Sequence, residues 1–154
     1  MKRVEQAIAH IAENINGKAV LEIACGCAEF SLAAAQTAKS VDGIDLDYLR
    51  LPPQAHKTED FAFTIMDATN MTFADGSFDT AVMYNAIGHL GAVLEKVLRE
   101  CLRVTKPGGA IFVISSLRTD MPLIDEKLLP LLAKKQITFA EESDGTFCYI
   151  KIER

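Results

Sequence analysis

The chain has 154 residues, of which 49% are hydrophobic, and a formal net charge of −5 at pH 7. This length and composition can bury one sizeable core, so we expect a single domain over residues 1–154, and no apolar run approaches the roughly 20 residues of a membrane span. The acidic balance disfavours nucleic acid as the main partner, because proteins that bind nucleic acid carry basic patches.

Helical and strand patterns alternate along the chain. The first residues lack the apolar core and cleavage site of a secretory signal, so we expect a cytoplasmic protein. Apolar residues recur at helical spacing over residues 4–15, and Asn16-Gly17 ends that helix. Apolar strands are expected at residues 18–24, 40–45, 61–66, 80–84 and 110–115. Such near-continuous apolar runs are typical of parallel strands with helices on both faces.

Two proline-containing segments interrupt the expected helices. Pro52 and Pro53 cut short the helix between the second and third strands, because proline removes a backbone donor and disfavours helix in the residue before it. After the fourth strand, an amphipathic helix is expected at residues 93–104. A further helix is expected at residues 122–136, and Pro130 should kink it or end it early.

The end of the chain changes character. Two extended segments, residues 137–142 and 146–152, flank Ser143-Asp144-Gly145. This arrangement predicts a β-hairpin, and therefore an antiparallel strand at one side of the parallel sheet.

The sequence offers no metal site. Its four cysteines lack paired C-x-x-C spacings, so we expect them to behave as small hydrophobic residues. Of the histidines, His10 falls in a helix and His56 in a proline-rich loop, and neither has neighbours that suggest a metal. The cysteines are Cys25, Cys27, Cys101 and Cys148.

The most informative segment is the turn after the first strand. Small residues stand at alternate positions, Ala24, Gly26 and Ala28, between a buried strand and a helix. Such a turn lets a ligand approach the backbone at the carboxyl edge of a sheet. A nicotinamide dinucleotide site calls for G-x-G-x-x-G, and Gly26 is the only glycine here, so a nicotinamide-dependent oxidoreductase is disfavoured.

Residues 22–28 resemble instead the first motif of the class I (seven-stranded, Rossmann-like) S-adenosylmethionine-dependent methyltransferase family. The resemblance covers nearly the whole chain, since five parallel strands and a closing hairpin match the sheet of that family. It implies an α/β three-layer sandwich with a seven-stranded, mostly parallel sheet that ends in an antiparallel hairpin strand. It also implies S-adenosyl-L-methionine as the cofactor.

The resemblance assigns the turn to cofactor binding. Ala24, Gly26 and Ala28 would lie against the cofactor, and Ala28 stands where the family usually has its last glycine, so its methyl group should face the ligand. Removing that methyl should tighten binding modestly. Glu22 ends a buried strand and needs a partner, for which the ammonium group of the cofactor is the natural candidate.

Acidic residues follow the next two strands. Asp45 lies about 20 residues beyond Gly26, the spacing at which a carboxylate accepts hydrogen bonds from ribose hydroxyls. By resemblance, Leu46 would lie against one adenine face. The alternative is that Asp45 or Asp47 only caps the next helix.

After the third strand, the family places an acidic side chain near the adenine amino group and a backbone N–H near a ring nitrogen. Asp67 and Ala68 stand at these positions. The alternative is that Asp67 is only a turn residue. Two further segments, residues 73–79 and 106–109, also resemble the family, and there they shape the chain rather than touch ligand.

The segment from Tyr84 to Leu90 should pass over the place where methyl transfer occurs. Asn85 is expected to contact the carboxylate or amino group of the methionine part. His89 could remove a proton from a substrate amine or hydroxyl, because its ordinary pKa lies near neutrality. The alternative is that His89 only packs against the following helix.

The resemblance therefore implies a methyltransferase that acts on a small-molecule N or O acceptor. Little sequence is added at the places where the family usually carries substrate specificity, so the cleft should be open, and a homodimer mate or a partner subunit could complete it. The alternative function is a non-catalytic S-adenosylmethionine-binding or scaffold subunit that works with a partner protein.

Overall fold

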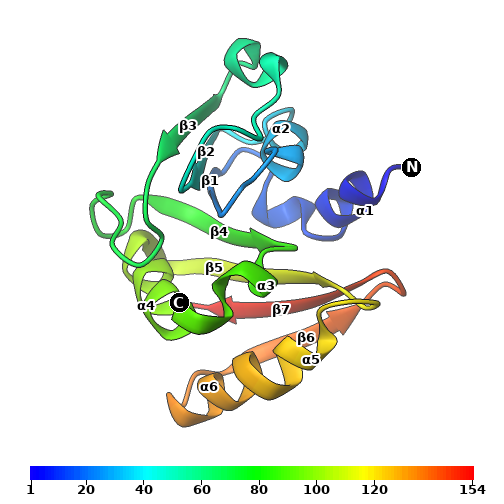
Figure 1. The fold of residues 1–154 in the computed structure, drawn as a ribbon, viewed down its shortest axis with the longest axis vertical. Helices are drawn as coiled ribbons and strands as arrows, with labels where there is room; N and C mark the ends of the chain where they lie inside the picture. The colour runs from blue at the N-terminus through cyan, green and yellow to red at the C-terminus, as the bar shows by residue number, and fades with distance from the viewer.

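A seven-stranded sheet forms the centre of the computed structural model, which describes residues 1–154 (Figure 1). The strand order is β3-β2-β1-β4-β5-β7-β6. The strands from β1 to β5 pair in parallel, and β7 pairs antiparallel with both β5 and β6. This confirms the expected sheet. The strands are β1 (Ala19–Ile23), β2 (Ser40–Asp45), β3 (Phe61–Ile65), β4 (Phe78–Tyr84), β5 (Thr105–Ser116), β6 (Phe139–Ser143) and β7 (Phe147–Glu153).

Helices cover both faces of this sheet. They are α1 (Arg3–His10), α2 (Glu29–Ala34), α3 (Ile87–Leu90), α4 (Leu94–Val104), α5 (Met121–Leu123) and α6 (Leu129–Lys134). Short 3₁₀ turns occupy Ala12–Asn14, Pro53–Lys57 and Gly91–Val93, and a π turn occupies Ile124–Leu128. The turn at Pro53 replaces the helix that the two prolines were expected to shorten. None of the helices is long and apolar enough to cross a membrane.

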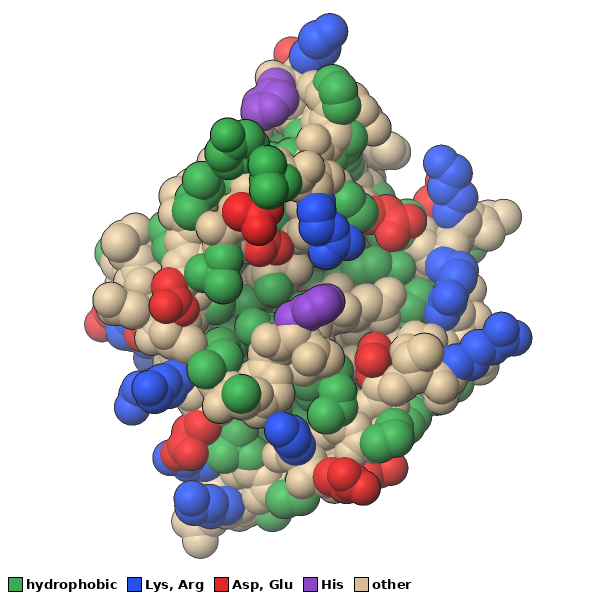
Figure 2. Space-filling model, in the orientation of Figure 1, with side chains coloured by type: hydrophobic (Ala, Val, Ile, Leu, Met, Phe, Trp, Pro, Cys, Tyr) green, Lys and Arg blue, Asp and Glu red, His purple; other side chains and the backbone are tan.

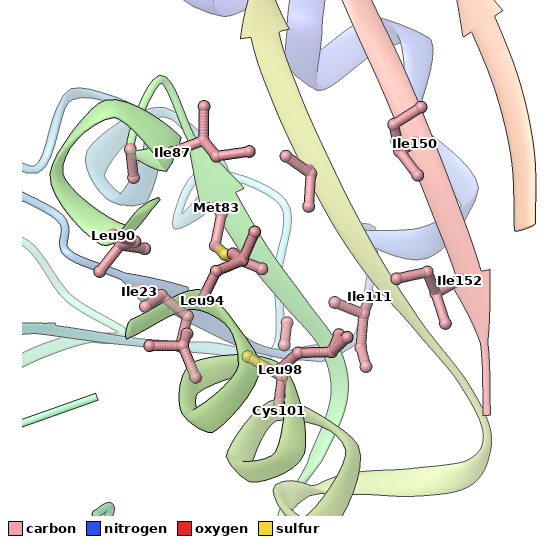
Figure 3. Packing of buried hydrophobic residues seen from close by; sticks show 14 of the residues in the cluster. Ile23, Met83, Ile87, Leu90, Leu94, Leu98, Cys101, Ile111, Ile150 and Ile152 are labelled. Atoms are coloured by element: carbon pink, nitrogen blue, oxygen red, sulfur yellow. The ribbon is translucent and has the colours of Figure 1, made fainter. Parts of the chain in front are cut away.

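The buried hydrophobic residues form two clusters, one on each face of the sheet. Side chains alternate across a strand, so Ile111 and Val113 of β5 join the larger cluster while Phe112 joins the smaller one. The larger cluster of 23 residues packs the sheet against α3 and α4 (Figure 3) and also against the segment from α5 to α6, through Ile124, Leu128 and Leu132. The smaller cluster of 16 residues packs it against α1 and α2. The three layers predicted from the apolar runs are therefore present.

The last helical segment passes through Pro130 instead of ending there. In the π turn, the N–H of Leu129 bonds to the carbonyl of Ile124, five residues earlier. Pro130 then falls in the first turn of α6, where a missing N–H leaves little unsatisfied. Of the two expected outcomes, an early end at Pro130 does not occur, because the helical path continues to Lys134, and the helix is instead irregular at the π turn just before the proline.

Strand β5 begins earlier than expected, at Thr105. The pairing register with β4 shifts between Phe78 and Thr80, so the predicted turn at residues 106–109 is part of a β-bulge. A methyl group built on Gly109 would lie 2.5 Å from the carbonyl oxygen of Asp79, which leaves room only for glycine. This segment shapes the chain, as expected, and lies within the strand rather than before it.

The connection from β3 to β4 contains no helix, and Arg103 of α4 holds it in place. The guanidinium of Arg103 donates to the carbonyls of Met71 and Phe73, at 3.0 and 2.8 Å, and to the carboxylate of Asp75, at 2.8 Å. It also pairs with Glu100, which accepts a hydrogen bond from the N–H of Met71 at 2.6 Å. One side chain thus satisfies backbone groups that a helix would otherwise satisfy internally.

We expect Arg103→Gln to lower the free energy of unfolding by about 1–2 kcal/mol, because it removes several part-buried hydrogen bonds at once. Denaturant unfolding measures the change. Arg99→Gln, on the same helix, is the control, since Arg99 is exposed and its side chain makes no hydrogen bond within the protein. Equal losses in the two variants would show that Arg103 does not stabilise the connection.

Candidate ligand-binding site

Two adjacent cavities lie at the carboxyl ends of β1, β2 and β4. The larger has a volume of about 400 Å³ and the smaller about 140 Å³. Both are lined by Ala24, Gly26, Arg50 and His89, so they are two halves of one site that meet at the turn after β1. The face drawn in Figure 2 is hollowed near its centre, between a histidine and a group of acidic and basic side chains.

The turn after β1 places three residues in the left-handed backbone region. The φ angles are +54° at Ala24, +53° at Gly26 and +58° at Ala28. Only glycine, which has no Cβ, adopts this region at low cost, so the backbone is strained at Ala24 and Ala28. Small side chains at these positions leave space for a ligand to approach the backbone.

Ala28 does not line either cavity. Its side chain is 0% exposed and packs in the core below the turn. The methyl group that was expected to face the ligand is therefore enclosed by protein atoms in this structure. Ala24, in contrast, lines both cavities.

We expect Ala28→Gly to leave the affinity for S-adenosylhomocysteine within about twofold, rather than to tighten it. Glycine relieves the strain of the left-handed backbone, which raises stability. It also removes a buried methyl group and increases the conformational entropy of the unfolded chain, which lower stability, so the effects should nearly cancel. Isothermal titration calorimetry and thermal unfolding measure the two quantities. A clear gain in affinity would show that the methyl group of Ala28 does face the ligand.

Glu22 is a buried carboxyl group beside the smaller cavity. It is 2% exposed, and its Oε1 accepts hydrogen bonds from the hydroxyl and the backbone N–H of Ser31, at 2.8 and 3.1 Å. Burial raises the pKa of Glu22 to about 8, against the lowering effect of these two bonds. A cation entering the smaller cavity would favour the ionised form.

Asp45 lies at the junction of the turn and the larger cavity. Its Oδ2 accepts a hydrogen bond from the N–H of Gly26 at 2.7 Å, and its Oδ1 accepts one from the N–H of Leu46 at 2.7 Å. No helix begins at residues 46–52, so Asp45 does not cap one. Asp47 stabilises a local turn through the N–H of Leu49, at 3.0 Å. Each Asp45 oxygen can accept a further bond.

Leu46 and Asp67 both line the larger cavity. Leu46 is 71% exposed and offers an apolar surface at its rim, and Ala68 also lines the cavity. Oδ1 of Asp67 accepts hydrogen bonds from the N–H and hydroxyl of Thr69, at 2.8 and 2.7 Å. These bonds lower the pKa of Asp67. Asp67 is thus a turn residue that also borders the cavity.

Asn85 and His89 border the smaller cavity from the segment after β4. Asn85 adopts a φ of +49°, and its side-chain oxygen accepts a hydrogen bond from the N–H of Ser116 at 3.1 Å. The side-chain amide of Asn85 therefore keeps its donors. His89 is exposed and lines both cavities, and its ring forms no hydrogen bond within the protein.

Arg50 is a site residue that the sequence did not indicate. A methyl group built on Gly26 would lie 3.0 Å from Nη1 of Arg50, so the guanidinium rests over the turn, between the two cavities. Arg50 forms no ion pair within 4.0 Å. Ser31, the partner of Glu22, was also missed. Neither position carries a motif, because the contacts depend on how separate elements meet.

A third cavity, of about 700 Å³, is larger than these two and lies elsewhere, in a groove between α1 and α2. It shares only Cys27 and Glu29 with the smaller of the two cavities at the turn. Its lining carries none of the expected site residues. We therefore place the candidate site at the turn, where the carboxyl ends of parallel strands meet.

The sheet order, the closing antiparallel hairpin and the small-residue turn together define a class I methyltransferase fold. Residues 21–113 match the sequence profile of a family described as "Methyltransferase domain", and the chain belongs to this family. The cofactor of this class is S-adenosyl-L-methionine.

Individual relatives agree with this assignment. Demethylmenaquinone methyltransferase of Desulfitobacterium hafniense is 31% identical over 134 residues, which cover 77% of this chain and 53% of the relative. The ubiquinone/menaquinone biosynthesis C-methyltransferase of Bdellovibrio bacteriovorus is 30% identical over 113 residues, which cover 70% of this chain and 48% of the relative. The chain thus spans about half the length of these curated relatives.

Solved structures show the same fold. A SAM-dependent methyltransferase from Aquifex aeolicus has a TM-score of 0.79 at 15% identity, with 96% of this chain and 89% of that chain covered. The PH0226 protein from Pyrococcus horikoshii has a TM-score of 0.74 at 24% identity, with 96% and 84% covered.

Proposed function

We propose that this protein is an S-adenosylmethionine-dependent methyltransferase whose acceptor is a small molecule with a quinone-type ring. The observation that carries the proposal is the pair of cavities that meet over Gly26, with a carboxyl group beside each, Asp45 and Glu22. A nucleoside joined to an amino acid needs such a two-part site. The names of the curated relatives support the acceptor class.

The residues present fit this cofactor. In the larger cavity, Asp45 would accept hydrogen bonds from the ribose hydroxyls, and Leu46 would contact one adenine face. The free oxygen of Asp67 and the N–H of Ala68 would bind the adenine edge. In the smaller cavity, Glu22 would pair with the ammonium group, and the amide of Asn85 would donate to the carboxylate.

The cofactor, when bound, supplies a methyl group on a positively charged sulfur, so the bond that breaks leaves a neutral thioether. The protein must hold the acceptor atom in line with that methyl group and near contact distance. His89 lies at the junction of both cavities and can take a proton from the acceptor. For a ring carbon, deprotonation of a neighbouring hydroxyl increases the electron density at the carbon, and the ring proton is lost after transfer.

The acceptor atom is the part of the proposal that changes from the sequence expectation. An N or O acceptor was expected, whereas one relative carries the name C-methyltransferase. We therefore propose carbon as the acceptor atom. Nothing in the lining of the two cavities selects nitrogen or oxygen in particular, since His89 is the only candidate base on both.

Two measurements test the function. Calorimetry with S-adenosylmethionine, S-adenosylhomocysteine and NAD should show binding of the first two and none of NAD. A radiolabelled methyl donor should then transfer label to a reduced demethylmenaquinone analogue, and less to a catechol or a primary amine offered in parallel. Binding without transfer to any acceptor would favour a non-catalytic subunit, and no binding would remove the proposed function.

A further inference from the structure

Glu22 and Ser31 form a buried pair between β1 and α2. Ser31 is 0% exposed and Glu22 is 2% exposed. Both the hydroxyl and the backbone N–H of Ser31 donate to the same oxygen of Glu22, Oε1, at 2.8 and 3.1 Å. The pair therefore fixes the position of the carboxyl group.

The pair exists because α2 begins without an ordinary cap. The residue at its N-cap is Ala28, whose side chain has no acceptor for the unpaired N–H groups of the first turn. Ser31 is the third residue of that helix, and its N–H finds an acceptor on Glu22 of the neighbouring strand. The carboxyl group of Glu22 thus caps the first turn of α2, and Ser31 holds that carboxyl group in place.

The second oxygen of this carboxyl group has a different environment. Glu22 lines the smaller cavity, and Oε2 receives no hydrogen bond from the protein. We propose that Ser31 is a positioning residue, which holds Oε1 of Glu22 and so leaves Oε2 to receive the ammonium group of the cofactor. This inference rests on the proposed function, because it assigns the ammonium group to the smaller cavity.

The charges around Glu22 make the role of Ser31 measurable. Two carboxylates face it, Asp45 from β2 and Glu29 from α2, whereas burial raises the pKa of Cys25 in the turn and of Tyr84 in β4, so these two groups stay uncharged near neutral pH. Arg50 and His89 are the basic side chains that line the same cavity. Ionised Glu22 is therefore opposed by burial and by its acidic neighbours, and the bonds from Ser31 favour it.

A pH dependence follows. Because burial raises the pKa of Glu22 to about 8, the empty site holds a largely protonated carboxyl group at pH 7. An ammonium ligand binds the ionised form better, so binding should release a proton near pH 7, and affinity should rise as the pH increases toward about 8. Removing the hydroxyl of Ser31 should raise the pKa of Glu22 further and move this rise to higher pH.

The test compares Ser31→Ala with Ser31→Thr, which keeps the hydroxyl. Calorimetry with S-adenosylhomocysteine from pH 6 to 9, in two buffers of different ionisation enthalpy, gives both the affinity and the protons released. For Ser31→Ala we expect roughly tenfold weaker binding at pH 7, a difference that shrinks toward pH 9, and a midpoint about one pH unit higher. Ser31→Thr should follow the unmodified protein. If Ser31→Ala does not fold, Ser31→Cys, with its weaker donor, should show the same change in smaller degree.

Other outcomes are distinguishable. An unchanged pH profile in Ser31→Ala, together with lower thermal stability, would show that Ser31 only stabilises the helix. A folded, unmodified protein that binds no S-adenosylhomocysteine would instead remove the proposed function, and the positioning role with it. Binding without proton release at any pH would place the ammonium group away from Glu22 and overturn the inference alone.

Discussion

Gly26→Val should abolish binding of S-adenosylhomocysteine, with an affinity loss of more than about a hundredfold, in a protein that still folds. Gly26 has a φ of +53°, and the first carbon of any side chain there would meet the guanidinium of Arg50 at 3.0 Å. A branched side chain resists the left-handed conformation and would occupy the place where the two cavities meet. Calorimetry measures the affinity, and circular dichroism checks the fold.

Gly145→Val is a matched control for this experiment. Gly145 also has a positive φ, +84°, in the turn between β6 and β7, and nothing lies within 4 Å of a methyl group built on it. Both variants carry backbone strain, so both should be less stable. Only Gly26→Val should lose the ligand. Similar affinities in the two variants would count heavily against the site.

Asp45→Ala is expected to weaken binding of S-adenosylhomocysteine by roughly ten- to a hundredfold. The substitution removes the carboxylate that would accept the ribose hydroxyls, and charge-assisted hydrogen bonds of this kind contribute about 1.5–3 kcal/mol. It also removes the acceptor for the N–H of Gly26, 2.7 Å away, so the turn itself becomes less fixed. Asp45 caps no helix, so the loss of stability should come only from the acceptor that the N–H groups of Gly26 and Leu46 lose, and should be about 1 kcal/mol.

Asp47→Ala provides the comparison for Asp45. Asp47 lies two residues away, and its carboxylate bonds to the N–H of Leu49 within a local turn. We expect less than about a threefold change in affinity for Asp47→Ala. Measuring the melting transition without ligand and the dissociation constant in each variant separates the roles. A stability loss in Asp45→Ala with unchanged affinity would be incompatible with a ribose contact.

The sheet could be predicted from sequence because its signals are local. Apolar strands such as residues 40–45 are bounded by turn residues, and the observed β2 has the same bounds. The hairpin signal at residues 143–145 likewise gave the antiparallel end. At Pro130 local propensity was misleading about an early end, because the π turn at Ile124–Leu128 places the proline in the first turn of α6, where its missing N–H leaves little unsatisfied.

The site was less accessible to sequence reasoning, for geometric reasons. The small size of Ala24, Gly26 and Ala28 is visible in the sequence, but only the folded chain shows that Ala24 and Gly26 line the cavities and that Ala28 is buried. Ser31 meets Glu22 through the packing of a helix on a strand. Arg50 lies in a loop without periodicity, so no pattern relates it to Gly26.

The guanidinium of Arg50 lies over Gly26 and separates the two cavities of the site. Adenosine alone could fill the 400 Å³ cavity and leave the guanidinium in place, and methionine alone could do the same in the 140 Å³ cavity. A ligand that joins the two pieces and lies against Gly26 would have to displace the guanidinium of Arg50, which lies 3.0 Å from a methyl group built on that residue. The affinities of such fragments therefore do not include the free energy needed to displace the guanidinium of Arg50. An inhibitor made by joining the fragments needs a linker that either replaces the guanidinium or accepts its hydrogen bonds.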